Sequence, residues 1–234
     1  MKIYCINLKR SIERREKMLA ELKKLPLESE FIDAVDGRQL SESELKQAYS
    51  KWRTRFRFGR GLTAGEIGCA LSHVKFYGQL LATEDKSAFV LEDDVTLTER
   101  AADALKEVQV FLEAADEPTL VELPGVERDM PMAADCKFVL VGGSMGTYAY
   151  GVNRAAAALL KEAFTPIKMP IDAYSYLVRK CGLKYYKYNE QVLTVDMAGE
   201  STIGTDRFFK LNQVQKIVFK FWRLIGKVVD YVLG

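Results

Sequence analysis

The stretch AFVLEDDV, residues 88–95, decides the fold and raises the question of function. Its small and apolar beginning, residues 88–91, indicates a buried strand, which three adjacent carboxylates then end: Glu92, Asp93 and Asp94. Like charges at adjacent positions repel one another, so the cluster needs a partner. From these residues alone, that partner could be a metal ion, an arginine or water.

The segments before this stretch alternate between strand and helix patterns. Residues 2–8 and 30–35 indicate two buried strands, and a charged helix between them extends to about residue 25. A longer helix is expected over residues 64–82. This order predicts right-handed crossovers and a parallel sheet at the start. Short strands expected after residue 118 make the sheet mixed, and the predicted fold class is α/β.

Two helix starts are marked by capping-box spacing, in which a serine or threonine precedes a glutamate by three residues. The pairs are Ser41 with Glu44 and Thr63 with Glu66. Between these helices, residues 53–63 carry four arginines and few hydrophobic anchors. We interpret that segment as a mobile basic loop.

The composition narrows the class of protein. The chain has 234 residues, 48% of them hydrophobic and 28% charged, which suits one sizeable α/β domain with an appended segment. A net charge of +2 does not favour nucleic acid as a partner. The single histidine argues against a zinc site and against a Ser-His-Asp triad, and the separated cysteines, Cys5 and Cys69 among them, suggest buried reduced thiols. Neither a signal peptide nor a spanning segment is evident, so a cytoplasmic protein is expected.

Polar residues follow each of the first three expected strands. Arg10 follows the first, Asp36 the second, and the carboxylates of residues 92–94 the third. Ligands of open α/β sheets gather at the carboxyl ends of strands. Oxygen ligands suit Mg²⁺ or Mn²⁺, so Asp93 and Asp94 are candidate metal ligands, although a solvated turn in which Asp94 caps the next segment is the alternative.

Seven segments, in this order and spacing, resemble glycosyltransferase family 25, and the resemblance covers residues 2–207. They are INLKRSIERREKM (6–18), AVDG (34–37), LTAGEIGCALSHVKFY (62–77), AFVLEDDV (88–95), GTYAYGVNRAAAALL (146–160), MPIDAY (169–174) and ESTIGTDR (200–207). The resemblance implies a GT-A-type fold, with a Rossmann-like mixed sheet flanked by helices. It also implies a nucleotide-sugar donor, often UDP-galactose, and inverting transfer to a sugar hydroxyl, usually with Mn²⁺.

The resemblance assigns roles to residues across the chain. Asp93 and Asp94 become ligands of Mn²⁺ or Mg²⁺, with Glu92 beside them. The residues expected to bind the nucleotide sugar are Leu8, Arg10, Arg14, Asp36, Ser72, His73, Glu92, Ser201, Thr202 and Arg207. Ordinary roles remain open for them: solvated arginines, a turn aspartate, a core histidine and a polar loop.

The acceptor hydroxyl must give its proton to a base within hydrogen-bond reach. Asp172 is the first candidate and Glu122 the reserve. Each has a structural alternative, because Asp172 could be the N-cap of the short helix that follows it and Glu122 could face the surface on an edge strand.

Residues 208–234 form a second expected unit, a C-terminal amphipathic helix. From residue 210 to 227 there are five basic residues and no acid, and Lys216, Lys220, Arg223 and Lys227 fall within one arc of a helix. A basic face opposite an apolar, aromatic one suits a helix lying on an anionic membrane surface through residues 210–232. A helix packed on the core or in a dimer is the alternative.

The expected function is an inverting glycosyltransferase that moves galactose from UDP-galactose onto a lipid-linked oligosaccharide, such as lipooligosaccharide, at the inner face of the cytoplasmic membrane. One alternative is a catalytically silent, membrane-associated protein that binds carbohydrate or nucleotide. Another is a sugar nucleotidyltransferase, which would also use clustered carboxylates but would release pyrophosphate.

Overall fold

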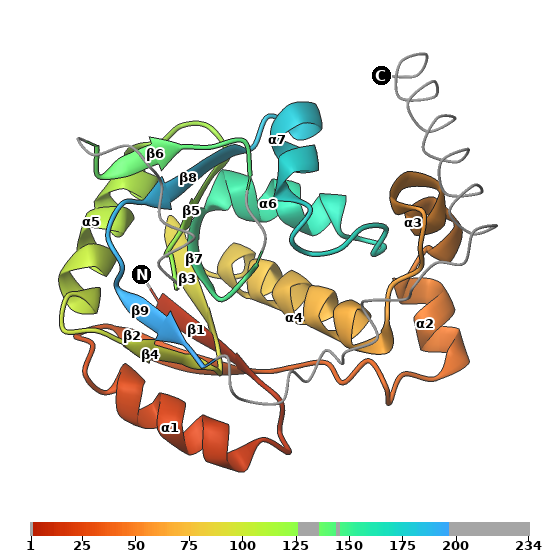
Figure 1. The fold of residues 1–234 in the computed structure, drawn as a ribbon, viewed down its shortest axis with the longest axis horizontal. Coiled ribbons are helices and arrows are strands. Elements are labelled where there is room, and N and C mark those ends of the chain that lie inside the picture. Colours follow the sequence, from red (N-terminus) through yellow and green to blue (C-terminus); the bar gives the residue numbers. More distant parts are fainter. Residues whose placement is uncertain (1, 126–135, 144–145, 197–234) are drawn as a thin grey trace.

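The computed structural model describes residues 2–125, 136–143 and 146–196 (Figure 1). Along the chain the elements are β1 (Lys2–Asn7), α1 (Ile12–Leu22), β2 (Glu28–Asp33), α2 (Glu42–Ala48), α3 (Lys51–Phe58), α4 (Ala64–Leu81), β3 (Ser87–Glu92), β4 (Val95–Leu97), α5 (Ala101–Ala114), β5 (Thr119–Glu122), β6 (Phe138–Leu140), β7 (Ala149–Asn153), α6 (Arg154–Ala163), α7 (Tyr174–Cys181), β8 (Lys184–Tyr188) and β9 (Leu193–Val195).

A seven-stranded mixed sheet forms the middle layer, with the strand order β2-β1-β3-β7-β5-β8-β6. Strands β2, β1 and β3 are parallel, and Ile6 pairs with Ile32 on one side and with Glu92 on the other. Their carboxyl ends therefore lie level at one edge of the sheet. The antiparallel strand β7 follows β3 in this order, which confirms the expected parallel start and mixed remainder.

Helices cover both faces of the sheet (Figure 1). On one face α4, α6 and α7 bury a core that includes Phe76, Tyr77 and Leu160. On the other face α1 and α5 bury Met18 and Leu105 together with β4 and β9, which pair as a separate two-stranded sheet. This is the mixed sheet flanked by helices that the resemblance implied.

Helix α4 is anchored at both ends. At its start, the Thr63 hydroxyl accepts a hydrogen bond from the amide of Glu66, and the Glu66 carboxylate accepts one from the amide of Thr63, as the capping box predicted. A Cβ atom on Gly68 would lie 2.4 Å from the carbonyl oxygen of Val35, so only glycine permits this approach to the loop after β2. At its end, the guanidinium of Arg154 donates to four carbonyl oxygens in and after the last turn, those of residues 80, 81, 83 and 85.

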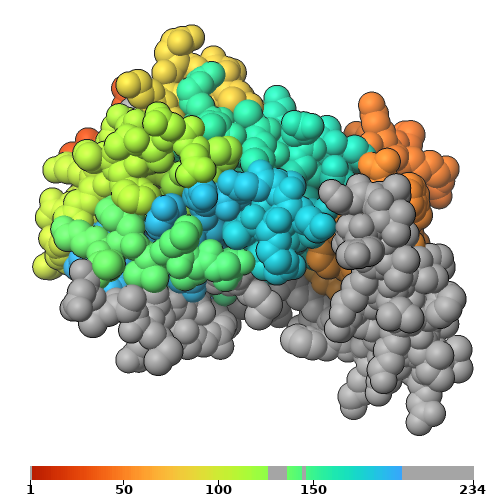
Figure 2. Space-filling view, turned by 90° about the horizontal axis from the view of Figure 1, so that it is seen from above, coloured from red at the N-terminus to blue at the C-terminus, as the bar shows by residue number. Residues whose placement is uncertain are grey.

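The first part of the basic segment after α2, residues 53–58, belongs to a helix and not to the mobile loop expected from the sequence, whereas residues 59–63 are not helical. Helix α3 packs through the buried Thr54, and the guanidinium of Arg57 lies 4.2 Å from the centre of the Tyr176 ring on α7. Gly59, with a φ of 74°, ends the helix. Together with α2, α3 forms one end of the molecule, shown in orange in Figure 2. Helix α1 is shorter than expected and ends at Leu22.

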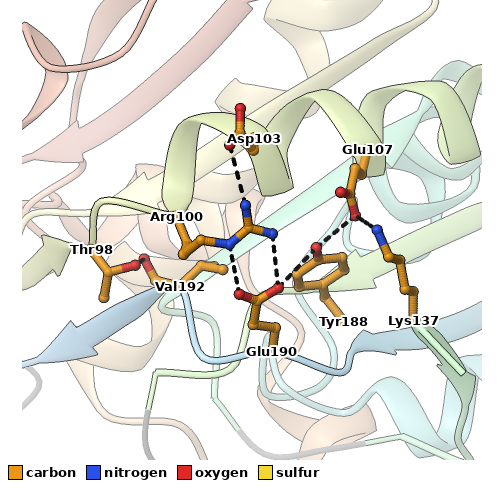
Figure 3. A network of polar contacts seen from close by, with 8 residues as sticks. All are labelled: Thr98, Arg100, Asp103, Glu107, Lys137, Tyr188, Glu190 and Val192. Carbon is orange, nitrogen blue, oxygen red and sulfur yellow. Dashed lines mark hydrogen bonds and ion pairs between the residues drawn. The ribbon is translucent and has the colours of Figure 1, made fainter. Parts of the chain in front are cut away.

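A polar network attaches α5 to the segment between β8 and β9 (Figure 3). Arg100 donates to Glu190 over 2.9 and 3.3 Å, and Glu107 accepts from the hydroxyl of Tyr188 over 2.8 Å. Lys137 lies 2.8 Å from the same Glu107 carboxylate. The network therefore joins three distant parts of the chain at the opposite side of the sheet from α4.

The expected C-terminal amphipathic helix, residues 208–234, lies outside the described residues. Among the helices that the structure describes, none combines the length and the apolar character needed to cross a membrane.

Candidate active site

A pocket lies at the carboxyl ends of β1, β2 and β3, against one face of α4. Its lining encloses about 600 Å³ of space, a figure that includes the solvent at its open mouth. The predicted residues that line it are Leu8, Arg10, Asp36, Ser72, His73, Glu92 and Asp93. The structure thus brings together residues from three strand ends and one helix.

Asp93 has an arginine as its positive partner. Arg14 on α1 donates to its carboxylate over 3.0 Å, and the buried Asn7 at the end of β1 donates over 2.7 Å. Because both donors come from elements fixed by the sheet, Asp93 is held in one orientation. Arg14 is therefore the positive partner of Asp93, whereas the partners of Glu92 and Asp94 have to be sought separately.

Asp94 is a carboxyl group of the cluster whose ionisation is opposed by its surroundings. Its Oδ1 atom is buried and has no hydrogen-bond partner among the described residues. Burial, followed by the negative charges of Glu92 and Asp93, raises the pKa of Asp94 to about 7. A buried carboxylate oxygen without a donor, in a set of oxygen ligands, fits a hard divalent cation.

Glu92 lies on the α4 side of the sheet. Thr147 donates a hydrogen bond to its Oε1 atom, and the Nε2 atom of His73 lies 3.5 Å from the same oxygen. His73 is fully buried, and its Nδ1 atom is 2.7 Å from the hydroxyl of Tyr150, which in turn is 2.8 Å from that of Tyr77. A buried polar chain therefore runs from Glu92 into the core.

Cys69 completes a second possible ligand set on this side. Its sulfur, a ring nitrogen of His73 and a carboxylate oxygen of Glu92 all lie within 4.8 Å of one another. The expectation that Cys69 is buried is wrong, since it is half-buried and lines the pocket, whereas Cys5 is buried as expected. Neither cysteine forms a disulfide among the described residues.

Two predicted residues use their polar groups within the protein. The hydroxyl of Ser72 accepts from the amide of Val35 over 2.8 Å and donates to the carbonyl of Gly68 over 2.7 Å, which ties α4 to the loop after β2. Asp36 accepts hydrogen bonds from the amide of Arg38 and from Arg10. Burial alone would raise the pKa of Asp36, but these hydrogen bonds hold it below its ordinary value.

The two candidate bases do not line the pocket. Asp172 is not the N-cap of α7, because that position belongs to Ala173 and no side chain caps the helix. The hydrogen bond to Glu66 at the start of α4 raises the pKa of Arg60, and the negative charge of Asp172 adds to this shift. Asp172 therefore lies on the side of the molecule where α4 begins.

Glu122 does not face the surface, as its structural alternative supposed. It is buried on the inner strand β5, where it accepts a 2.5 Å hydrogen bond from Tyr185 and lies 3.6 Å from Lys187. Its charge thus has a cation and a hydroxyl beside it. The remaining predicted residues, Ser201, Thr202 and Arg207, lie outside the described part of the chain.

Sequence reasoning missed four residues that shape the site: Asn7, Cys69, Thr147 and Tyr150. Asn7 had a visible signal, because an amide at the end of an otherwise apolar strand needs a partner. Cys69 is four residues before His73 and therefore shares its helix face. The other two come from β7 and the segment before it, and no local pattern reveals their proximity.

Comparison with protein families matches residues 1–175 to glycosyltransferase family 25, described as an LPS biosynthesis protein. Over 96 residues the chain is 43% identical to a glycosyltransferase 25 family member of Aedes aegypti and 40% identical to procollagen galactosyltransferase 2 of Homo sapiens. Each match covers 40% of this chain and 16% or 15% of the relative.

A longer match is to inactive glycosyltransferase 25 family member 3 of Homo sapiens, with 29% identity over 194 residues, 74% of this chain and 30% of that protein. The chain therefore aligns with less than a third of the length of these relatives.

Among solved structures, S. aureus TarS 1–349 in complex with UDP-GlcNAc aligns with a TM-score of 0.49 and 11% identity, over 94% of this chain and 64% of that chain. A glycosyltransferase involved in the glycosylation of the major capsid of PBCV-1 aligns with a TM-score of 0.42 and 10% identity, over 95% and 98% of the two chains. At these scores the likeness carries no argument about function.

Proposed function

The chain belongs to glycosyltransferase family 25, and we propose that it is an active, metal-dependent, inverting galactosyltransferase that extends a lipid-linked oligosaccharide from UDP-galactose. One observation carries the proposal. Asp94 holds a buried carboxylate oxygen without a hydrogen-bond donor, next to two further carboxylates that line or border a pocket at the sheet's carboxyl edge. Such a concentration of carboxylates suits a divalent cation that neutralises the leaving diphosphate.

Asp93 and Asp94 are the proposed ligands of Mn²⁺ or Mg²⁺. When bound, such an ion would stabilise the negative charge on the leaving nucleoside diphosphate. The protein's own part is to hold the ligands in place, and the hydrogen bonds from Asn7 and Arg14 to Asp93 do so without any metal. Fixed ligands avoid reorganisation during the reaction.

Two further groups of residues would bind the donor. Arg10 is half-exposed at the pocket, paired with Asp36, and is the proposed cation for the diphosphate. Leu8 and Asp36 lie after β1 and β2, where the nucleoside of a donor is expected in open α/β sheets. The proposed base remains Asp172, with Glu122 in reserve.

The proposal includes a contact with an anionic membrane surface, for which α3 offers support within the described residues. The helix carries four basic residues, none of its residues is acidic, and Trp52 is 68% exposed. Burial and the charges of Arg53 and Arg57 lower the pKa of the nearby Lys168, so positive potential is concentrated there. An exposed tryptophan among basic side chains suits the headgroup region of an anionic bilayer. Residues 210–232 remain the other proposed contact.

The name of one relative, inactive glycosyltransferase 25 family member 3, makes a catalytically silent binding protein the second candidate. Turnover distinguishes the two. UDP-galactose, a galactose-terminated glycolipid acceptor and Mn²⁺ should yield UDP and an extended glycolipid with the wild type, and at least about 100-fold less product with Asp94→Asn. Asp103→Asn, a carboxylate on the remote helix α5, is the matched control.

Each other outcome points to a different function. Donor binding without product in any acceptor would favour the silent protein, and release of pyrophosphate from UTP and a sugar phosphate would favour the nucleotidyltransferase. Product formation unchanged by Asp94→Asn and by chelation would contradict the metal role.

For the base, Asp172→Asn should lower kcat by about 10² to 10⁴ while Glu122→Gln lowers it less.

A further inference from the structure

Three side chains with ligand atoms of different chemistry face one another at the wall of the pocket. Cys69 and His73 are one turn apart on α4, and Glu92 ends the adjacent strand β3. Their sulfur, nitrogen and oxygen atoms lie within 4.8 Å of one another, and the Nε2 atom of His73 is 3.5 Å from Oε1 of Glu92. A turn of helix and the end of a strand, both rigid, set this spacing.

His73 supplies the independent sign that a ligand belongs there. The side chain is fully buried, and its Nε2 atom has no hydrogen-bond partner among the described residues. The other ring nitrogen, Nδ1, is 2.7 Å from the hydroxyl of Tyr150. A histidine that donates from Nδ1 to such an oxygen has its lone pair on Nε2, the arrangement found in metal-binding histidines.

In the tautomer with its hydrogen on Nδ1, the lone pair of Nε2 faces the Glu92 carboxylate, which is repulsive unless a cation lies between them. The opposite tautomer would place a hydrogen on Nε2, but 3.5 Å is too long for a good hydrogen bond to Glu92. Thr147, which is buried, meanwhile fixes the Glu92 carboxylate through its hydroxyl. Both partners are thus held in orientations that suit a shared cation.

We propose that Cys69, His73 and Glu92 form a site for a borderline metal ion such as Zn²⁺, separate in ligand chemistry from the oxygen-only site assigned to Asp93 and Asp94. Thiolate and imidazole prefer Zn²⁺ to Mn²⁺ or Mg²⁺. Ligand atoms of a tetrahedral zinc site lie about 3.5 Å apart, which His73 and Glu92 already match, and the Cys69 sulfur lies within 4.8 Å of both. Upon binding, the Cys69 thiol releases its proton to solvent.

The sequence argued against zinc because the chain has a single histidine, and the proposed site uses only that one. Cysteine and glutamate supply the other two ligands, and a fourth position stays open toward the pocket. Zinc bound there would withdraw Glu92 from the donor pocket and occupy part of it. This consequence, inhibition competitive with the nucleotide sugar, rests on the proposed function, whereas the metal site itself does not.

Cobalt is the probe, because Co²⁺ substitutes for Zn²⁺ and a thiolate ligand gives it an intense charge-transfer absorption in the near ultraviolet. The full chain, with thiols reduced and excess Mg²⁺ present to fill oxygen-only sites, would be titrated with Co²⁺ and no nucleotide. We expect one equivalent of Co²⁺ to produce the charge-transfer band and Zn²⁺ to abolish it. Cys69→Ser, a near-isosteric change at a half-buried position, should lose the band and retain the wild-type circular dichroism.

Cys181→Ser is the matched control, since Cys181 is an exposed thiol at the end of α7, and it should keep the band. A folded wild type that shows no charge-transfer band would overturn the proposal, and so would a band that survives Cys69→Ser. Neither result depends on sugar transfer, so failure here is distinguishable from failure of the proposed activity.

Discussion

Arg14 donates a hydrogen bond of 3.0 Å to Asp93, and this contact joins the first helix of the chain to the acidic cluster at the end of β3. The guanidinium stands where a cation is needed, so part of the repulsion among residues 92–94 is already relieved without any metal. Both partners are largely shielded from solvent, with 28% and 13% of their side chains exposed. Electrostatic pairs in such positions are screened less than surface pairs.

Replacing this arginine should therefore destabilise the metal-free protein. We expect Arg14→Ala to lower the free energy of unfolding by roughly 2 kcal/mol at neutral pH and low salt, because Asp93 loses its charged partner. Added Mn²⁺ should recover more stability in the variant than in the wild type, since the ion takes over the lost positive charge. Denaturant titrations with and without Mn²⁺ measure both effects.

The neighbouring Arg15→Ala is the control for that series, because Arg15 lies over the ring of Phe31 instead. It should show no such gain with Mn²⁺. Equal Mn²⁺ responses of the two variants would mean that Arg14 does not relieve the cluster's charge.

The raised pKa of Asp94 predicts an unusual dependence of the free energy of unfolding on pH. Its pKa in the folded protein, about 7, lies above the ordinary 3.8, so the folded state holds the proton more tightly than the unfolded state. Stability from this group is present below about pH 4 and is lost as the pH rises to about 7. Without metal, Asp94→Asn should be more stable than the wild type by roughly 2 to 4 kcal/mol at pH 8 and equally stable at pH 4.

Thermal or chemical unfolding across pH 4 to 8 in a chelator checks this. Saturating Mn²⁺ should reverse the order at pH 8, because only the wild type keeps the ligand. A variant that is less stable than the metal-free wild type at pH 8 would contradict the raised pKa.

Two glycines of α4 should respond oppositely to alanine. Gly68→Ala would place a methyl group 2.4 Å from a backbone oxygen of the loop after β2, which must then move. We expect a loss of about 2 kcal/mol or more and weaker donor binding, since that loop carries Asp36. Gly78→Ala, where the nearest atom is the end of Lys161 at 3.8 Å, should gain about 1 kcal/mol from helix propensity. Unfolding free energies of both variants, measured side by side, decide whether the close approach is essential.

The proposed membrane contact through α3 can be measured with vesicles. Trp52→Ser combined with Arg53→Ser should reduce co-sedimentation with vesicles containing phosphatidylserine several-fold, because it removes an aromatic anchor and a charge. The matched control is Val110→Ser with Lys106→Ser, an exposed apolar and basic pair on α5. Equal loss in both variants, or binding to uncharged vesicles alone, would argue against a specific basic surface.

The sequence was sufficient to place the strand ends, and hence much of the site. Apolar runs set the parallel register of β1 with its neighbours, so Arg10, Asp36 and Glu92 had to meet at one edge. What lay across the sheet could not be foreseen. Thr147 and Tyr150 reach the site because β7 inserts beside β3, and strand order depends on tertiary packing that no local pattern encodes.

The basic segment shows a different limit. Residues 53–63 suggested a loop because hydrophobic anchors are few, but the helix is held by a buried threonine and by Arg57 against Tyr176. The prediction of a loop gave too little weight to the good intrinsic helix propensity of arginine. Asp172 is not the N-cap of α7, and Glu122 is buried instead of facing the surface. Sequence spacing alone does not reveal either position.

Because α4 is anchored at both ends, the residues on its face toward the pocket occupy fixed positions along one wall. Residues four apart along it, such as Gly65, Cys69 and His73, line the pocket at positions about 6 Å apart along the helix axis. Exchanging side chains between these levels would move a contact by a whole step without shifting the backbone. Redesign of ligand preference in this protein can therefore proceed level by level along a single helix.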